Sequence, residues 1–198
     1  MRQVFSIAAA LMLLAATAAT AAVSDFDFRL ARNTAKEQAA VRQLERLFNR
    51  YDISRFSFTY SIMLDEYGAP HSFPQLTLNA YYLDDDAGAL STFLHEQLHW
   101  YGLANQVAVD AAVADLKTLY PRVPVGRGEG ARDEASTYLH LIVGLQEYDA
   151  AASYVGRAEA ARVLSSKRHY RWINKQVLEN TNLIRAVLQK HGLDKPSA

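Results

Sequence analysis

The feature that most constrains the fold is a segment around residue 140 that is apolar on almost every side. Residues 138–145 read Tyr-Leu-His-Leu-Ile-Val-Gly-Leu, and only His140 interrupts them with a strongly polar side chain. Asp133 is a residue type that begins helices, so we expect a helix from there to about Glu147. A helix without a polar face has to be surrounded by other elements. The sequence therefore predicts a central, buried helix with a histidine in its middle.

Helical periodicity marks most of the remaining chain. Apolar residues recur every three or four positions over residues 33–51, 87–101 and 107–116, which predicts three further helices. Residues 149–191 read as two amphipathic helices with a break within residues 165–169. The chain is therefore expected to be mainly helical.

Two short segments have the composition of strands instead. Residues 56–64 and 76–83 are rich in aromatic and β-branched residues or alternate in polarity, and a Gly-Ala-Pro turn signal at residues 68–70 separates them. We expect the two strands to pair antiparallel. The predicted fold class is α+β, a mainly helical single domain with a small antiparallel sheet that precedes the helix over residues 87–101.

Composition limits the classes of partner. The chain has 198 residues, which suits one domain, and 21 Lys and Arg residues balance 21 Asp and Glu residues. This balance predicts no surface for nucleic acid and no basic cluster for an anionic membrane. The chain has no cysteine, so we expect no lipoprotein-type anchor. Any zinc site must use histidine and carboxylate ligands.

The first 22 residues resemble an export signal. Arg2 supplies a positive charge, residues 4–16 form an uncharged apolar run, and Ala-Thr-Ala sequences at residues 16–18 and 19–21 fit the small-residue cleavage pattern. The run is short for a bilayer span, although a membrane anchor is the alternative. We expect residues 1–22 to be a signal peptide and residues 23–198 to form a metallohydrolase domain. It would be exported by a bacterium to the periplasm or medium, without a stable membrane anchor.

The motif that carries chemistry is His-Glu-Gln-Leu-His at residues 95–99. In a helix, positions i and i+4 lie one turn apart on the same face, so the imidazoles of His95 and His99 can bind one metal ion. Glu96 lies beside the metal, where its carboxylate can take a proton from a metal-activated water molecule. We predict a zinc site with Glu96 as the catalytic general base. The alternative is a surface helix with two incidental histidines.

The same motif resembles the signature of the zincin superfamily of zinc metallopeptidases. The resemblance covers roughly residues 56–102 and implies a third ligand from further along the chain and hydrolysis of a peptide or protein substrate. The metzincin branch does not fit, because position 105 is asparagine and all three methionines, at positions 1, 12 and 63, precede the motif. The pattern is closer to gluzincin-like proteins, without assignment to a subfamily.

Two residues of the expected central helix are candidates for the third zinc ligand. His140 lies in an apolar segment, where an imidazole needs a partner such as a metal ion. Glu134 is similar in place to the glutamate that a second helix supplies in gluzincins, but an acidic residue in a first helical turn needs no metal to explain it. The two residues face different directions and should not share one ion, and we predict His140. Glu147, on the same face as His140, is a candidate to orient a ligand, and the alternative is that it ends the helix in solvent.

Donors for a developing oxyanion are expected within residues 167–172. His169 and Tyr170 resemble, in chemical type, the residues that many zincins use for this purpose, and the alternative is that Tyr170 packs into the core. The sequence as a whole predicts an exported zinc-dependent hydrolase, most simply a metallopeptidase. The competing function is a non-catalytic zinc-binding protein with a structural or interaction role. Neither the substrate's identity nor the oligomeric state follows from the sequence.

Overall fold

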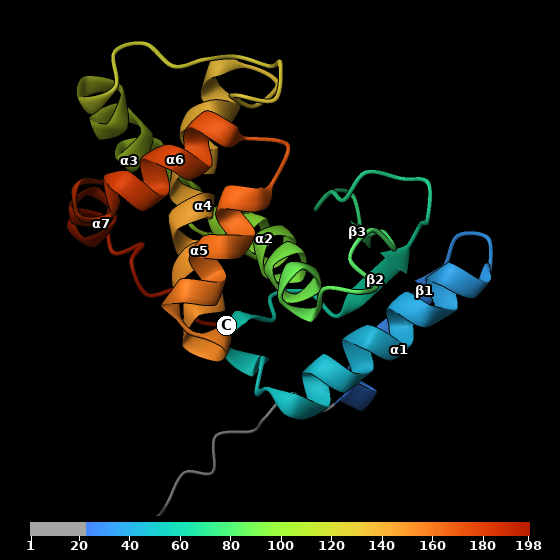
Figure 1. Cartoon of the computed structure of the whole chain (residues 1–198). Coiled ribbons are helices and arrows are strands. Elements are labelled where there is room, and N and C mark those ends of the chain that lie inside the picture. The colour runs from blue at the N-terminus through green and yellow to red at the C-terminus, as the bar shows by residue number, and fades with distance from the viewer. Residues whose placement is uncertain (1–22) are drawn as a thin grey trace, which may run out of the picture.

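The computed structural model describes residues 23–198, and the predicted signal peptide over residues 1–22 lies outside the described residues. In the described part, seven α-helices and a three-stranded sheet form a single, mainly helical α+β domain (Figure 1). The elements, in chain order, are η1 (Val23–Asp25), β1 (Asp27–Leu30), α1 (Ala35–Arg50), η2 (Ser54–Phe56), β2 (Ser61–Leu64), β3 (Leu76–Leu78), α2 (Asp86–Ala104), α3 (Gln106–Leu119), α4 (Glu134–Val155), α5 (Arg157–Ser166), α6 (Arg171–Glu179) and α7 (Thr181–Lys190).

Helix α4 is the centre of the helical part, as the sequence predicts. It contacts α2, α3, α5, α6 and α7, and Figure 1 shows it running among them. The side chain of Asp133 caps its first turn by accepting a hydrogen bond from the backbone N–H of Ser136 at 2.7 Å. The helix continues beyond the predicted end at Glu147 as far as Val155. It ends at Gly156, whose φ of +84° lies in the region that favours glycine.

The sheet is parallel, so the predicted antiparallel pairing is wrong. The strands lie in the order β1-β2-β3, with Ile62 of β2 opposite Leu76 of β3. The chain reverses at the predicted turn, where the N–H of Gly68 donates to the carbonyl of Asp65 at 3.2 Å. It reverses again after His71, which forms an antiparallel bridge with Thr77. Two reversals restore the original direction, and β3 therefore runs parallel to β2.

The strands are also shorter than the patterns suggest. Only Ser61–Leu64 of the predicted strand over residues 56–64 pairs, and only Leu76–Leu78 of the one over residues 76–83. The sequence does not reveal β1, because Asp27–Leu30 has no fully buried residue and carries a weak alternation of exposed and half-buried positions. β1 forms because it lies beside β2 in parallel register.

The C-terminal part contains one helix more than predicted. The expected break within residues 165–169 is present, since α5 ends at Ser166 and α6 begins at Arg171. A second break at Asn180 separates α6 from α7. No helix within residues 23–198 has both the length and the apolar character needed to cross a membrane.

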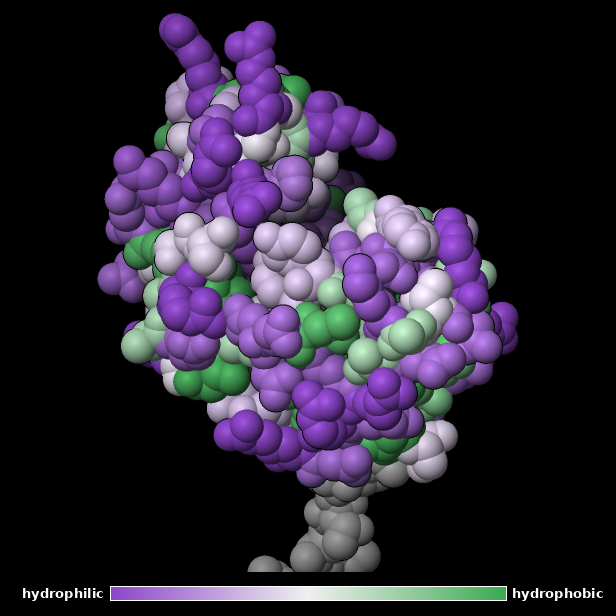
Figure 2. Space-filling model, turned by 45° about the vertical axis from the view of Figure 1, so that its right-hand side comes forward, coloured by the Kyte–Doolittle hydropathy of each residue, from purple (hydrophilic) through white to green (hydrophobic). Residues whose placement is uncertain are grey.

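Two apolar clusters fill the interior, and α4 contributes to both. The first joins the sheet, α1 and α2, where the ring of Phe48 lies with its centroid 4.7 Å from those of Phe26 and Phe93. The second lies among α3, α4, α6 and α7. Hydrophilic residues cover most of the face in Figure 2, which is hollowed between the two parts of the molecule.

Candidate metal centre

Helix α2 presents the histidine motif toward α4. Its start is fixed by Asp85, whose side chain accepts a hydrogen bond from the N–H of Gly88 at 3.0 Å. One helical turn separates His95 from His99, so both rings lie on the same face. Helix α4 packs against this face and brings His140 to the two rings. The packing of two helices therefore assembles a group that is dispersed in the sequence.

Three histidines form a cluster suited to one metal ion. One ring nitrogen from each of His95, His99 and His140 lies within 4.8 Å of the others. The Nε2 atoms of His95 and His99 are 3.3 Å apart, and the ring centroid of His140 lies 5.4 Å and 4.9 Å from those of His95 and His99. His95 and His140 are buried, at 8% and 7% exposure. Their convergence is the arrangement that the sequence predicted for the metal ligands.

The Nδ1 atoms of His95 and His140 already have hydrogen-bond partners. Nδ1 of His95 lies 2.8 Å from a carboxylate oxygen of Glu147, and Nδ1 of His140 lies 2.7 Å from the carbonyl oxygen of Ser136. An ionised carboxylate and a carbonyl only accept hydrogen bonds, so Nδ1 carries the proton in both rings. The Nε2 atoms are then left with lone pairs that point into one small space. A cation bound there satisfies them together, and imidazole is a preferred ligand of zinc.

The surroundings keep the rings of His99 and His140 in the form that binds metal. Burial, together with the neighbouring His95 and His140, lowers the pKa of His99 to about 2. Burial and the proximity of His95 lower the pKa of His140 to about 4. Only a neutral imidazole has a free lone pair. The cluster is therefore ready to bind a metal ion at neutral pH.

Glu147 supports the cluster from inside the protein. Its side chain is 1% exposed and accepts hydrogen bonds from Ser91 and Lys167 as well as from His95. Burial raises its pKa, but the charge of Lys167 and the contact with His95 outweigh this effect and hold the pKa at about 2. The carboxylate is ionised and orients the His95 ring. This agrees with the prediction that Glu147 orients a ligand.

Glu96 lies beside the cluster and is held by a loop. The hydroxyl of Ser72 donates a hydrogen bond to its Oε2 at 2.6 Å, and the group is 6% exposed. The indole N–H of Trp100, one turn further along α2, donates to the carbonyl oxygen of Ser72 at 3.1 Å. The loop between β2 and β3 is thus fixed to the same helix that carries Glu96. No partner of the other oxygen, Oε1, is present among the described residues.

Tyr170 covers the cluster from the segment between α5 and α6. Its ring centroid lies 4.4 Å from that of His140 and 6.2 Å from that of His95. Its φ of +61° places a large side chain in the left-handed region, which costs free energy and is common at functional sites. Burial and the charge of Glu96 raise its pKa, so its hydroxyl stays protonated. Tyr170 lines the open cleft, and it also packs, half-buried, against the second apolar cluster, as does Trp172, so the predicted alternative of inward packing holds in part.

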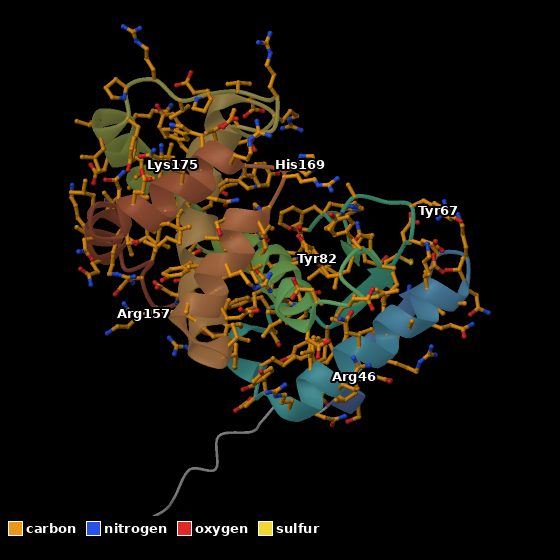
Figure 3. All side chains as sticks on the ribbon, in the orientation of Figure 1. Arg46, Tyr67, Tyr82, Arg157, His169 and Lys175 are labelled. Carbon is orange, nitrogen blue, oxygen red and sulfur yellow. The ribbon has the colours of Figure 1, made fainter. Side chains whose placement is uncertain are left out.

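The site opens into a cleft of about 1320 Å³. Figure 3 labels one lining residue from each side, Tyr82 and His169. His169 is exposed, whereas Tyr170 is half-buried. The two walls differ in chemistry. Residues of the wall formed by the loop before α4 and the segment after α5 include the cations Arg127, Arg132 and Arg168. The facing wall presents aromatic side chains, namely Phe73, Tyr81 and Tyr82.

Not every candidate reaches the site. Glu134 is exposed in the first turn of α4 and belongs neither to the histidine cluster nor to the residues that line the cleft. Three supporting residues escaped the sequence analysis in these roles: Ser72, Ser91 and Lys167. Ser91 lies one turn before His95 on α2, which is a detectable spacing. Ser72 has no such signal, because only the doubly reversing loop brings it to Glu96.

Comparison with known proteins adds no assignment. No protein-family model, curated protein or solved structure matches the chain. The class that the fold and the site define is therefore a mainly helical α+β protein with a buried three-histidine cluster that could hold a metal ion.

Proposed function

We propose that this protein is a zinc-dependent hydrolase that cleaves a peptide or protein substrate. His95, His99 and His140 hold the metal ion, and Glu96 is the general base. The observation that carries this proposal is the convergence of three imidazole nitrogens next to a buried carboxylate at the floor of a cleft. Three protein ligands are typical of catalytic zinc sites, whereas structural sites usually have four.

The metal contributes chemistry that the side chains lack. When bound, it acts as a Lewis acid that lowers the pKa of a coordinated water molecule and polarises the carbonyl group under attack. The protein's part is to keep His99 and His140 neutral, through the burial that lowers their pKa values. Glu147 fixes the orientation of His95 through the contact between Nδ1 and Oε2.

Glu96 accepts a proton at Oε1 and later returns it to the leaving group. Its Oε2 is engaged by Ser72, which restricts rotation of the carboxylate. The hydroxyl of Tyr170 is a donor for the negative charge that develops on the substrate, because its raised pKa keeps it protonated. His169 lines the same cleft, is exposed, and is the second candidate for this donor.

The substrate class rests on the resemblance to zincins. The HExxH motif over residues 95–99 and the helix that carries it are shared with those metallopeptidases, while a third histidine takes the place of the glutamate found in gluzincins. Export also remains part of the proposal: residues 1–22 would act as a signal peptide, and residues 23–198 would work in the periplasm or outside the cell.

Zinc content and turnover test the proposal together. We expect one zinc ion per purified chain and cleavage in a broad set of fluorogenic peptides. Glu96→Gln should retain zinc and lose about 10²–10⁴-fold in kcat, which is the usual contribution of a general base. Glu134→Gln, an equal change on the exposed start of α4, is the matched control and should keep both properties. A wild-type chain that takes up no zinc, or Glu96→Gln with full turnover, would contradict the proposal.

A further inference from the structure

Lys167 is a half-buried cation that the proposed reaction does not use. Its side chain is 14% exposed, and its ammonium group donates to Oε1 of Glu147. Removing both charges from water costs several kcal/mol per ion unless the pair is well satisfied, so a buried pair alone is weak support for a role in stability. The question is why this cation is placed against this carboxylate.

The same carboxylate links three parts of the molecule. Its Oε2 holds Nδ1 of His95 on α2, its Oε1 receives Ser91 and Lys167, and Glu147 itself belongs to α4. Lys167 follows directly after α5, at the start of the segment that leads to α6. One buried group therefore connects a metal ligand with the segment that forms one side of the cleft.

Apart from the Lys167 side chain, the segment over residues 167–170 is held through its backbone: the N–H of Lys167 donates to the carbonyl oxygen of Leu164, and Asn174 donates to the carbonyl oxygens of His169 and Tyr170. At its end, Tyr170 adopts a left-handed backbone and reaches over His140, and the next residue, Arg171, donates its N–H to the carbonyl oxygen of Gly128 at 2.9 Å. At its start, the side chain of Lys167 is the contact that reaches the interior. Arg168 and His169, between these two ends, are exposed. Without Lys167, the placement of Tyr170 would depend mainly on the contacts at its far end.

We infer that Lys167 is a positioning residue that couples metal binding to the placement of Tyr170, through Glu147 and His95. This inference rests on the proposed metal site. A metal ion that fixes His95 also fixes the carboxylate behind it, and the carboxylate holds Lys167. Coupling of this kind is reciprocal: the ion orders the segment, and the ordered segment increases the affinity for the ion by the same factor.

Amide hydrogen exchange with and without zinc tests the coupling. Exchange reports local opening of the backbone, so it can be read separately in the peptide covering residues 165–171 and in α2 around His95 and His99. In the wild-type chain, zinc should slow exchange in both regions. In Lys167→Met, zinc should slow exchange in α2 but leave the segment 165–171 unchanged. The affinity for zinc should fall about tenfold, the lower end for outer partners of a metal ligand.

Three further variants make the result specific. Lys167→Arg keeps the positive charge and should restore the response of the segment to zinc. Lys175→Met removes an exposed lysine from α6, labelled in Figure 3, and should behave as wild type. The double variant Glu147→Gln/Lys167→Met avoids leaving a buried charge without its partner, so it should fold if Lys167→Met does not, and its segment should also fail to respond.

The outcomes separate the inference from the proposed function. A wild-type chain that binds no zinc would contradict the proposed function. Zinc binding without any change in the segment 165–171, or an equal change in Lys167→Met and wild type, would overturn the coupling and leave the metal site intact. A zinc response that is lost in Lys167→Met and restored in Lys167→Arg supports the coupling.

Discussion

Two glutamates in this protein are almost completely inaccessible, and they are held in opposite ways. Glu37, at 0% exposure, lies in the first turn of α1, and Glu147, at 1%, lies near the middle of α4. Glu37 receives backbone N–H groups from Arg32, Thr34 and Glu66 at 3.0–3.2 Å. Glu147 receives only side chains, two from α2 and one from the segment after α5.

The difference shows that the hydrogen-bond partners of a buried carboxylate indicate whether it serves the fold or a functional site. Burial raises the pKa of Glu37, but the surrounding backbone donors outweigh it and hold the pKa below its usual value. These donors belong to a helix cap and a turn, and their hydrogen bonds stay within that part of the fold. One partner of Glu147 is His95, whose other ring nitrogen, Nε2, faces Nε2 of His99. A buried carboxylate that is bonded only to backbone N–H groups stabilises the fold. A buried carboxylate that orients a histidine with a free lone pair supports a candidate metal site.

The largest expected effect comes from removing the centre that Glu147 supports. His140→Ala should abolish tight zinc binding, with a loss exceeding the ~10–100-fold usual for outer partners of a ligand. Its matched control is Glu134→Ala on the same helix, which should change the affinity less than threefold, because Glu134 lies outside the cluster. Equilibrium dialysis against zinc measures both. The reverse result would make Glu134 the third ligand. Glu147 would then no longer differ from Glu37 by its link to a histidine-based metal site.

The next effect compares the two carboxylates directly. Glu147→Gln removes the charge next to His95 and Lys167, and we expect zinc affinity to fall about 10–100-fold. Glu37→Gln makes the same chemical change at a similarly buried position and should leave zinc affinity unchanged. Competition with a chromophoric chelator gives both constants. Equal losses in the two variants would show that zinc affinity follows general stability rather than the contacts of Glu147.

The smallest effect is the pH dependence of stability that belongs to Glu37. Because its folded pKa is lowered from the ordinary 4.5, its contribution is complete above pH 4.5 and is lost as the pH falls through the folded value. Glu37→Gln should lower the Tm by a few degrees at pH 7, since 1 kcal/mol corresponds to ~2–4 °C in a domain of this size. The gap to wild type should narrow below pH 4.5. Thermal melts of metal-free protein measure it, and a gap that widens in acid would contradict the assignment.

The sequence predicts the helices of this fold better than the sheet, for a physical reason. The helix around His140 and the one that carries residues 95–99 are defined by local periodicity and by the capping aspartates Asp133 and Asp85. Strand direction depends on how the chain returns. Here two reversals within residues 65–75 make β3 parallel to β2, and the second of them leaves no clear turn signal.

The residues of the candidate site divide in the same way, into those predictable from one helix and those that depend on loops. His95, Glu96 and His99 follow from spacing on one helix, and His140 follows from the cost of burying an imidazole in an apolar helix. Their meeting, and the contacts of Ser72 and Lys167, depend on loops whose course no periodicity records. Segment chemistry can therefore be predicted from sequence, whereas the partners that come from loops need the structure.

The hydrogen bond from Ser72 to Glu96 has a directional consequence for the proposed reaction. With Oε2 engaged at 2.6 Å, a proton taken up at Oε1 has to be released from Oε1 as well, because exchanging the two oxygens would break the bond to the serine. The entering water and the departing amine must then approach the carboxylate from the same side. In the proposed peptidase, this hydrogen bond would favour the binding direction that presents the scissile nitrogen of the peptide to Oε1.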